Sequence, residues 1–453
     1  MTERRLSARE VIERIADDSS FTELPHPERD SGPDGPLSWQ GYDASHARAA
    51  ERTGEDESVV CGTATVAATR AVLLAFEFGF LGGSLGERTG DRLESAYTYA
   101  RAHRLPVVPL VATGGSRMQE GMLALTQLQR VARQSILTRE AGLPQIAVLR
   151  DPTTGGGWAT LGAGADVTLA LRGAQVGFAG SRVRPPDADP AAYTAEAQVA
   201  TGAADAVVRP EELRGVLGRW LGVLAGPPAR EATVPHALGA HDLPGTGWDA
   251  VRRARAAQRP HAEAYLDACF TSRVTISGDR CGGADPDGIL CGFGAHDGRT
   301  VAYAAQTGTA TRPAGYRTAA RLIRLADRLG IPVLTLVDTP GAANDAEAER
   351  QGVGAAIADL FGAVAGARVP ITTLVIGEGG SGGALALAAP GNTWATPDSY
   401  FSVIAPELAA AILKRRPEEV EATADQLRIR PQDLVELGVI RGVVGGPSGE
   451  SMA

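Results

Sequence analysis

The sequence predicts an α/β protein built from two tandem copies of one domain. Short apolar runs rich in Val, Ile and Leu alternate with amphipathic segments of helical spacing, a pattern typical of strands and helices in one sheet-based fold. A glycine-rich turn follows several of these runs. The series of run, turn and helix occurs twice, and the second series follows the first at a constant offset in residue number.

The repeat is clearest where apolar runs end in glycine. Residues 107–121 (VVPLVATGGSRMQEG) resemble residues 332–346 (PVLTLVDTPGAANDA), and the match aligns Pro340 with Gly114. Such a match between distant segments indicates a duplicated structural unit.

Two further segments keep the same offset. LPQIAVLRDPTTGGGWATL is similar to VPITTLVIGEGGSGGALAL, and the offset that aligns Pro340 with Gly114 also aligns Pro370 with Pro144. In the turns that precede these segments, Gly308 falls on Gly82. Three units of apolar run and glycine therefore keep one register.

Each copy also contains a helix that leads into a strand. Residues 92–103 (RLESAYTYARAH) and 317–328 (RTAARLIRLADR) place Leu, Ile, Ala and Tyr at helical spacing. The runs LPVVPLV and IPVLTLV follow these helices. The order strand, glycine turn, helix, strand is thus predicted in both copies.

The chain divides into four predicted segments. The polar, proline-bearing residues 1–43 are expected to be an N-terminal extension, followed by a first domain at 44–228. Residues 229–247 contain many Pro and Gly and are expected to be a linker. The second domain is expected at 248–453.

Composition excludes several classes of function. The formal net charge of −9 over 453 residues argues against nucleic-acid binding. The first residues lack the apolar core of a secretory signal, and no apolar run is long enough to cross a membrane, so a cytoplasmic protein is expected. The four cysteines form no C-x-x-C pair, so we expect reduced thiols and no metal.

Lysine is almost absent from the chain. Lys414 is the only lysine beside 43 arginines. A Walker loop needs Gly-Lys-Ser/Thr, and Ala384 follows Gly382-Gly383 instead. Covalently attached biotin also needs a lysine in a particular motif, which this chain lacks.

Residues 375–387 (VIGEGGSGGALAL) fit two well-known patterns at once. They contain G-x-S-x-G around Ser381, but in an α/β-hydrolase the histidine follows the serine, and the last histidine here is His296. They also contain G-x-G-x-x-G, but late in the domain, whereas a dinucleotide fold places it in the first turn. We therefore expect neither a serine nucleophile nor a dinucleotide site.

A third interpretation follows from the repeat. Glycine turns also occur at residues 112–117 (ATGGSR) and 153–158 (TTGGGW), at equivalent places in the first copy. Glycines let a ligand approach the main chain, and free N–H groups at the start of a helix favour negative charge. Such turns suit an oxyanion hole, although they also suit simple close packing.

These blocks together resemble the carboxyltransferase component of biotin-dependent acyl-CoA carboxylases, especially acetyl-CoA carboxylase. The first half is similar to the β subunit through LSWQGYDASHARAAERTG, FGFLGGSLGERTGDRL, TGGSRMQEG and DPTTGGGWATLG. The second half is similar to the α subunit through SGDRCGGADP, PAGYRTAARLIRLADRLGIPVLTLVDTPGA, VIGEGGSGGALAL and SYFSVIAPE. The resemblance extends from about Ser20 to Val444.

The resemblance implies a crotonase-like fold, in which β-β-α units wind into a spiral. It implies an enzyme that moves CO2 from carboxybiotin, held on a separate carrier protein, to the α-carbon of an acyl-CoA such as acetyl-CoA. Malonyl-CoA would form through an enolate. The protein would contribute positioning and two backbone oxyanion holes.

Site residues follow from the resemblance by position. Gly114 and Gly115 would hold the thioester oxygen. Gly382, Gly383 and Ala384 would hold the ureido oxygen of biotin.

The remaining candidates are expected on the substrate side: Gly82, Gly83, Arg117, Gly156, Gly157, Gly341 and Ala386. Of these, Gly82 and Gly83 would shape the CoA side, and Ala386 would leave room for the acyl group. Arg117 has a second interpretation, which we favour, as a local ion pair with Glu120.

The resemblance also implies partners. The chain has neither a biotin carrier motif nor an ATP-grasp segment, so a biotin carboxyl carrier protein and a biotin carboxylase would be separate, and the chain would form at least a homodimer. The loop at residues 306–317 is shorter than in the α subunit. This departure leaves open a biotin-independent decarboxylase of a malonyl-type thioester, on CoA or a carrier protein, or a non-catalytic scaffold.

Overall fold

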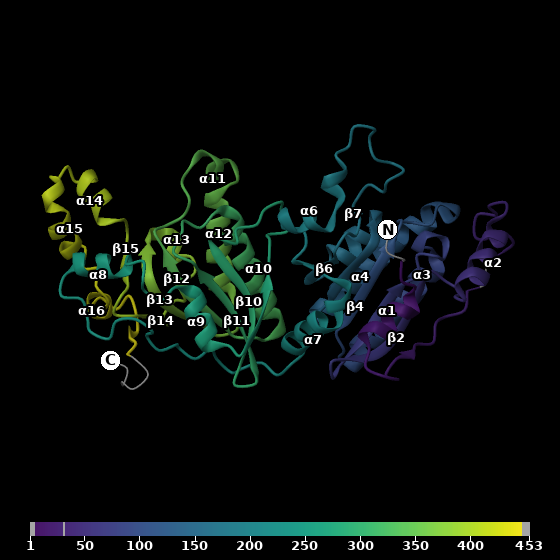
Figure 1. Cartoon of the computed structure of the whole chain (residues 1–453), viewed down its shortest axis with the longest axis horizontal. Coiled ribbons are helices and arrows are strands. Elements are labelled where there is room, and N and C mark those ends of the chain that lie inside the picture. Colours follow the sequence, from purple (N-terminus) through teal and green to yellow (C-terminus); the bar gives the residue numbers. More distant parts are fainter. Residues whose placement is uncertain (1–4, 30–31, 446–453) are drawn as a thin grey trace. The chain divides into compact units, whose positions relative to one another are not determined.

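The chain folds as two compact units, Met1–Gly226 and Pro227–Ala453, in a computed structural model that describes residues 5–29 and 32–445 (Figure 1). Each unit is built on one eight-stranded sheet with helices packed against it. This architecture confirms the predicted α/β class.

The first sheet has the strand order β1-β2-β3-β4-β5-β6-β8, and β7 pairs with the end of β5. The pairs β1–β2 and β2–β3 are antiparallel, and all later pairs are parallel. The strands are β1 (Thr22–Glu23), β2 (Val59–Val66), β3 (Thr69–Phe76), β4 (Val107–Thr113), β5 (Ile146–Thr154), β6 (Val167–Leu171), β7 (Val176–Gly177) and β8 (Ala206–Val208).

Helices cover the first sheet, and α3 and α4 pack against each other. The α-helices are α1 (Ala8–Ile15), α2 (Tyr42–Thr53), α3 (Glu87–His103), α4 (Gly121–Glu140), α5 (Gly155–Gly157), α6 (Ala195–Ala200) and α7 (Leu213–Leu224). Two short 3₁₀ turns border the candidate site, η1 (Leu81–Gly83) and η2 (Met118–Glu120).

The second sheet has the equivalent order β9-β10-β11-β12-β13-β14-β16, and β15 pairs with the end of β13. Its strands are β9 (Ser272–Ile276), β10 (Ile289–His296), β11 (Arg299–Gln306), β12 (Val333–Thr339), β13 (Ile371–Gly380), β14 (Thr393–Ala395), β15 (Tyr400–Ser402) and β16 (Gly442–Val443). Antiparallel and parallel pairs follow one another in the same order as in the first sheet.

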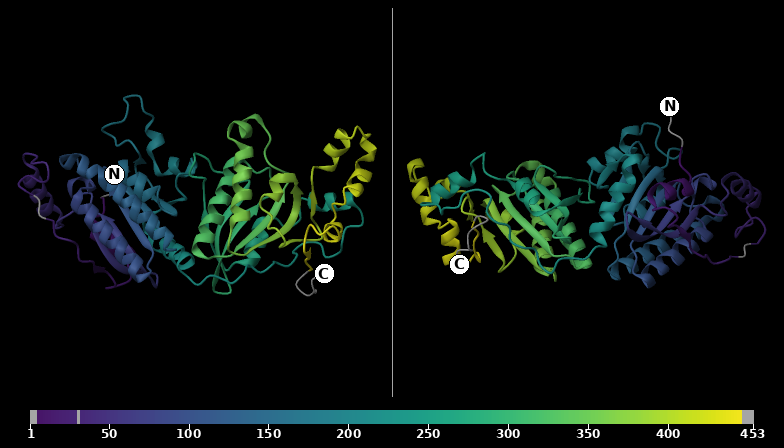
Figure 2. Two further views of the ribbon diagram at one scale, coloured as in Figure 1. Left: turned by 180° about the vertical axis from the view of Figure 1, so that it is seen from behind. Right: turned by 60° about the horizontal axis from the view of Figure 1, so that its bottom comes forward.

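Helices lie against this sheet as well, and Figure 2 shows them from two further sides. They are α8 (Gly247–Ala254), α9 (Ala262–Cys269), α10 (Pro313–Leu329), α11 (Ala346–Arg350), α12 (Val353–Gly366), α13 (Ser381–Leu385), α14 (Pro406–Ile412), α15 (Val420–Gln426) and α16 (Pro431–Glu436). α10 and α12 pack against each other.

The predicted repeat is confirmed at the level of single residues. The offset that aligns Pro370 with Pro144 also places both ends of β12 on those of β4, and both ends of α10 on those of α3. A shift in pairing lies between Val111 and Thr113 in the first sheet and between Val337 and Thr339 in the second. Strand order, helix position and this irregularity therefore all keep the register predicted from the sequence.

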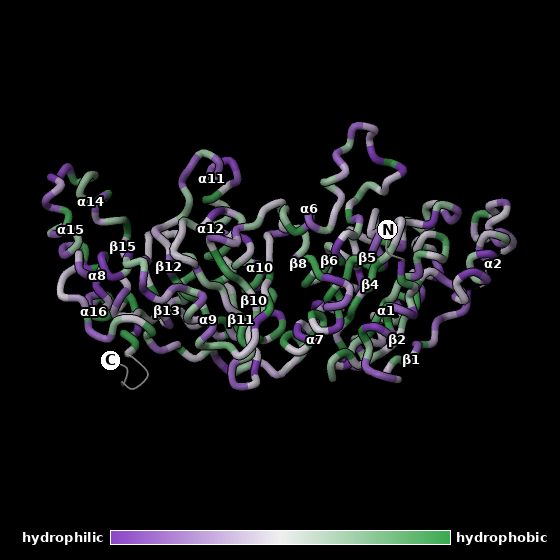
Figure 3. Tube along the Cα trace, viewed as in Figure 1, coloured by the Kyte–Doolittle hydropathy of each residue, from purple (hydrophilic) through white to green (hydrophobic). Residues whose placement is uncertain are grey.

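The central strands carry the core of each unit, as the hydropathy of the chain shows (Figure 3). Parallel strands with both faces covered are apolar along their whole length, which explains the runs in the sequence. Residues 8–15 at the start of the chain bury an apolar face, and β1 pairs with β2. Ala232 and Ala237, in the glycine- and proline-rich seam, belong to the core of the second unit.

Candidate active site

Two glycine turns lie side by side where parallel strands of the first sheet end. β4 ends at Thr113, which pairs with Thr153 near the end of β5. A Cβ atom on Gly155 would lie 3.2 Å from the Cα of Gly115, so the two turns touch through their main chains. Only glycine allows such an approach here.

The N–H groups of the first predicted donors are already used inside the protein. The N–H of Gly114 donates to the carbonyl of Gly82 at 2.9 Å, and the N–H of Gly115 donates to Oγ1 of Thr113 at 3.0 Å. A Cβ on Gly83 would lie 2.1 Å from the carbonyl oxygen of Ala112. These glycines hold the turns against each other.

The neighbouring turn at α5 is different. The N–H of Gly155 donates to the carbonyl of Phe178 at 3.0 Å. As the second and third residues of α5, Gly156 and Gly157 have N–H groups without a partner inside that helix. Added Cβ atoms would lie 2.4 Å from Leu128 and 2.3 Å from Thr113, so both positions require glycine. Two unpaired N–H groups at a helix start suit an anion or a polarised oxygen.

The second unit repeats this arrangement. β12 ends at Thr339, whose Oγ1 accepts the N–H of Gly341 at 3.1 Å. α13 (Ser381–Leu385) then begins directly after β13, and its first N–H groups are those of Ser381, Gly382 and Gly383. As the second and third residues of α13, Gly382 and Gly383 have N–H groups without a partner inside the helix. The N–H of Ala384, four residues after the N-cap Gly380, is the first that the helix itself pairs. The backbone thus presents a second set of unpaired donors.

Ala386 closes the C-terminal end of α13. Its N–H donates to the carbonyl of Gly382 at 3.0 Å, and its side chain is fully buried. The structure therefore places this predicted residue behind the turn, within packed protein.

Unusual backbone angles recur at equivalent positions of the two units. The pairs with positive φ are Gly82 and Gly308 (69° and 96°), Gly115 and Gly341 (112° and 141°), and Gly155 and Ser381 (61° and 59°). A side chain makes this conformation costly, so its retention at Ser381 indicates that the turn is fixed by its surroundings. Among the described residues, no histidine forms a hydrogen bond with this serine.

Arg117 is buried in a network of charged and polar groups. Only 1% of it is exposed, and it donates to Glu57 at 3.0 Å, to Glu120 at 3.2 Å and to the hydroxyl of Tyr42 at 3.2 Å. Burial would raise the pKa of Glu57, but the charge and hydrogen bonds of Arg117 outweigh it and lower the pKa to about 2. The predicted ion pair with Glu120 is present.

Glu120 extends this hydrogen-bond network to α3. Its second oxygen accepts the N–H of Glu87, the first residue of α3, at 2.6 Å. Sequence analysis missed Glu57 and Tyr42, because both lie far along the chain from Arg117. The whole network is internal, so Arg117 positions the turn and α3.

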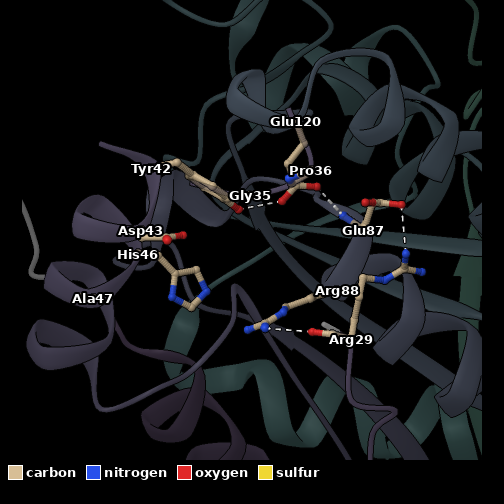
Figure 4. A pocket seen from close by; sticks show the side chains of 10 residues that line it. All are labelled: Arg29, Gly35, Pro36, Tyr42, Asp43, His46, Ala47, Glu87, Arg88 and Glu120. Carbon is tan, nitrogen blue, oxygen red and sulfur yellow. Dashed lines mark hydrogen bonds and ion pairs between the residues drawn. The ribbon is translucent and has the colours of Figure 1, made fainter. Parts of the chain in front are cut away.

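A cavity of about 260 Å³ adjoins this network (Figure 4). It is lined by Arg29, Gly35, Pro36, Tyr42, Asp43, His46, Ala47, Glu87, Arg88 and Glu120. Figure 4 shows His46 from α2 and Arg88 from α3 on the same space. Burial lowers the pKa of His46, and its Nε2 is buried without a partner in the described structure. Because α2 packs on η1, the cavity lies beside the Gly82 turn.

In the second unit, a histidine and a carboxylate lie beside the equivalent turn. Nδ1 of His261 is 3.2 Å from Oδ2 of Asp338, and Arg259 donates to both oxygens of that carboxylate at 2.7 and 2.8 Å. A Cβ on Gly308 would lie 3.3 Å from each member of the pair. The sequence signal was weak, because the three residues come from two distant segments.

The buried cysteines Cys61 and Cys291 are not candidates for catalysis. Burial raises the pKa of Cys61 and of Cys291 to about 12, so both thiols stay protonated at neutral pH. In the described ranges, no three potential metal ligands come together. No helix in them is both long and apolar enough to cross a membrane.

Comparison with protein families matches both halves of the chain. Residues 36–200 match the family described as carboxyl transferase domain. Residues 244–452 match the family described as acetyl co-enzyme A carboxylase carboxyltransferase-like. The two matches cover most of both units.

Several curated proteins are similar over nearly the whole chain. The acetyl-coenzyme A carboxylase carboxyl transferase subunits beta/alpha of Salinispora arenicola are 39% identical over 473 aligned residues, covering 98% of this chain and 83% of that protein. The protein of the same name from Clostridium tetani is 31% identical, with 98% and 80% covered. A probable biotin-dependent acyl-coenzyme A carboxylase beta3 subunit of Mycobacterium bovis is 34% identical, with 89% and 83% covered.

Solved structures share the fold. Transcarboxylase 12S superposes with a TM-score of 0.80 at 21% identity, covering 97% of this chain and 87% of that one. A single-chain, multi-domain long-chain acyl-CoA carboxylase gives a TM-score of 0.73 at 21% identity, covering 98% of this chain and 46% of that one.

Proposed function

Because the chain belongs to the acetyl-CoA carboxylase carboxyltransferase family, with β-like and α-like parts in one polypeptide, we propose that it carboxylates the α-carbon of an acyl-CoA such as acetyl-CoA. Family membership confirms the resemblance found in the sequence, the crotonase-like fold and the assignment as an enzyme. The comparisons favour neither a decarboxylase nor a scaffold.

The observation that carries the proposal is the repeated pair of glycine turns with unpaired N–H groups. In the first unit, Gly156 and Gly157 would donate to the thioester oxygen as it gains charge in the enolate. Gly114 and Gly115, whose N–H groups are engaged, would hold these donors in place. Their own role as donors stays a prediction.

The second turn fits the ureido oxygen of biotin. The N–H groups of Gly382 and Gly383, at the start of α13, match an oxygen acceptor that carries negative charge. The role of Ala384 as a donor stays a prediction. Carboxybiotin on a separate carrier protein would supply both the CO2 and the base for the α-proton. Losing one such donor costs roughly 3–4 kcal/mol in enzymes that stabilise an oxyanion.

The cavity beside η1 suits the remote part of the substrate. Arg88 and His46 are among the residues that line it, and α2, which carries His46, packs on the turn that contains Gly82 and Gly83. We propose that it receives polar groups of CoA or of a carrier-bound pantetheine. Gly341 would support the second turn through its bond to Thr339.

Two predicted substrate contacts take other roles in this proposal. Arg117 is closed off by its ion pairs and would position η2 and α3. Ala386 is packed behind α13, so it would restrict the acyl group only through the shape of that turn.

Biotin carboxyl carrier protein and biotin carboxylase are the proposed partners, in the cytoplasm. A homodimer or higher homo-oligomer is also proposed, and exposed apolar side chains on both units support it. In the first unit Met118 and Met122 are 74% and 66% exposed, and in the second Leu408 and Ile412 are 56% and 69% exposed. Light scattering of the purified chain should show no monomer.

The test is incubation of the purified chain with malonyl-CoA, with and without free biotin. CO2 and acetyl-CoA are followed by mass spectrometry. Turnover that requires biotin supports carboxyl transfer, here run in reverse. Turnover indifferent to biotin would instead indicate a decarboxylase, and acetyl-CoA carboxylation would then also be absent when carboxybiotin is supplied.

A further inference from the structure

Three charged or titratable side chains form a cluster beside Gly308, at the carboxyl ends of parallel strands in the second sheet. Asp338, on β12, is fully buried, and Arg259 donates to both of its carboxylate oxygens. His261 directly precedes α9, and its Nδ1 lies 3.2 Å from Oδ2 of Asp338. Ligands of α/β sheets with parallel strands bind at this edge, so the cluster is placed to contact one.

Asp338 is held in one orientation by its neighbours. Besides Arg259 and His261, the N–H of Glu378 donates to Oδ1 at 3.2 Å. A Cβ on Gly377 would lie 2.3 Å from Oδ1 of Asp338 and 2.5 Å from Arg259, so β13 closes the other side of the carboxylate. Burial raises the pKa of Asp338, and the charge and hydrogen bonds of Arg259 oppose this rise. The carboxylate is therefore fixed where His261 meets it.

This carboxylate decides which nitrogen of His261 carries the ring proton. An ionised carboxylate can only accept hydrogen bonds, so Nδ1, which faces it, is the protonated nitrogen of the neutral ring. Nε2 is then left with a lone pair and can only accept. Among the described residues Nε2 has no hydrogen-bond partner, and 42% of the side chain is exposed. The ring thus offers a fixed acceptor to a ligand that brings an N–H group.

The imidazole lies close to the second glycine turn without being part of it. A Cβ on Gly308 would lie 3.3 Å from Nδ1 of His261, so glycine lets the backbone pass close to the ring. The next residue is Thr309, whose carbonyl accepts the hydroxyl of Thr339 at 2.8 Å. The oxygen of that hydroxyl accepts the N–H of Gly341. Two hydrogen bonds therefore connect the segment beside His261 to the turn.

The first unit has no equivalent of this cluster. The offset of the repeat places Ala112 at the position of Asp338, and alanine can neither pair with an arginine nor orient a histidine. The equivalent strand β4 forms without it, so the fold does not require the cluster. The proposed function assigns biotin to the second unit, and the cluster occurs in that unit alone.

We propose that His261 is a ligand-contacting residue whose Nε2 accepts a hydrogen bond from a ureido N–H of biotin, with Asp338 and Arg259 as positioning residues. Biotin has two such N–H groups, and one of them remains when the other nitrogen carries the carboxyl group. That N–H is a donor, as the lone pair of Nε2 requires. The inference rests on the proposed function and adds a side-chain contact to a site otherwise formed by the backbone.

The first test measures biotin-dependent malonyl-CoA turnover at about pH 8, above the range in which imidazoles usually take up a second proton. His261→Phe has no acceptor. We expect its KM for free biotin to rise about 3- to 10-fold, the factor typical of one lost hydrogen bond, with KM for malonyl-CoA unchanged. His261→Gln offers an acceptor oxygen, so its KM for biotin should lie nearer to the wild-type value.

Binding is measured separately, without malonyl-CoA. Saturation-transfer NMR of free biotin, titrated against the wild type and each variant, should give affinities in the same order as the KM values. This measurement needs no turnover, so it decides the contact with biotin by itself. A wild type that binds biotin but shows no biotin-dependent turnover would overturn the proposed function and leave the contact standing.

His296→Phe is the matched control. Nδ1 of His296 lies 2.7 Å from the carbonyl oxygen of Cys269, and 34% of the side chain is exposed. His296 is the last residue of β10 and lies beside the start of β11, whereas Gly308 follows the end of β11. Its replacement should change neither KM nor the affinity for biotin.

Each outcome decides the inference. An unchanged affinity for biotin in His261→Phe would overturn it. An equal rise of KM for malonyl-CoA would also overturn it, because the ring would then support the second unit as a whole and not biotin. Circular dichroism of the variant shows whether such a general loss comes from unfolding.

Discussion

The two glycine turns of the molecule have the same backbone path and are held by opposite hydrogen bonds. In the first unit the N–H of Gly114 donates back to the carbonyl of Gly82. The equivalent of Gly114 is Pro340, which has no N–H to give. There the N–H of Gly308 donates to the carbonyl of Asp338 at 2.8 Å. The backbone path is therefore the same in both units, although the hydrogen bond between the two segments runs in the opposite direction.

The side chains around the turns differ more than the turns themselves. The first unit uses the buried ion pair of Arg117 with Glu57. The second unit uses the buried ion pair of Arg259 with Asp338 and, in addition, the side-chain amide of Gln306, which donates to the carbonyl of Gly383. The comparison teaches that the fold dictates where unpaired N–H groups lie, while each unit has found its own means of holding them.

The largest effect on stability is expected from Arg117→Met, which removes the buried ion pair of the first unit. Glu57 would remain as a fully buried charge without its partner, which typically costs about 3–5 kcal/mol. Hydrogen exchange read by mass spectrometry should show faster opening of residues 44–226 than of the second unit. Arg209→Ala, in an exposed ion pair with Glu212, should change neither unit.

Gly383→Ala should disable the second turn alone. A Cβ there would lie 2.6 Å from the backbone nitrogen of Ala342, so the turn must move. We expect biotin-dependent turnover to fall about 10²–10³-fold, the cost of a lost oxyanion donor. Gly362→Ala, in α12 with open space around it, is the control. Unchanged turnover in Gly383→Ala would contradict a role for this turn.

Acid should weaken the first unit through the protonation of Glu57. The pKa of Glu57 is lowered in the folded state to about 2, so its contribution to stability is complete above its ordinary pKa of 4.5. This contribution is lost as the pH falls from that value toward 2. Hydrogen exchange measured between about pH 5 and pH 3 should show the loss, and Glu57→Gln should reduce the pH dependence. An equal dependence of hydrogen exchange on pH in the wild type and in Glu57→Gln would rule out Glu57 as the source of the acid sensitivity.

The smallest effect is expected at Ser381, where the second unit departs from the glycine of the first. Ser381→Gly should relieve the positive φ of 59° and stabilise the second unit by about 1 kcal/mol. Gly155→Ala should have the opposite sign in the first unit. Denaturant unfolding of both variants checks the pair, and equal signs would show that these positions are not equivalent.

Much of this architecture could be predicted from the sequence, because the duplicated pattern carries its own register. The offset predicted from Pro144 and Pro370 holds for β4, α3 and the pairing shift. The glycine turns could be located for the same reason, since each follows an apolar strand.

The supporting contacts could not be predicted. Glu57 meets Arg117, and Gln306 meets Gly383, across 60 and 77 residues of chain. Such contacts depend on which side chains the folded strands bring together, and no local periodicity records them. The sequence also could not show which N–H groups remain unpaired. Gly114 and Gly156 both lie in glycine-rich turns, and only the folded chain supplies an acceptor for Gly114.

The two units differ in the length of the connection that follows β3 in the first and β11 in the second. The connection from Gln306 to Gly308 is much shorter than the equivalent one from Phe76 to Gly82. Because this connection is shorter, the end of β11 lies beside the glycine turn. The position that Phe76 occupies in the apolar core of the first unit is therefore occupied in the second by Gln306, which contacts Gly383. Two copies of one sheet can therefore present different side chains to equivalent turns when a single connection differs in length.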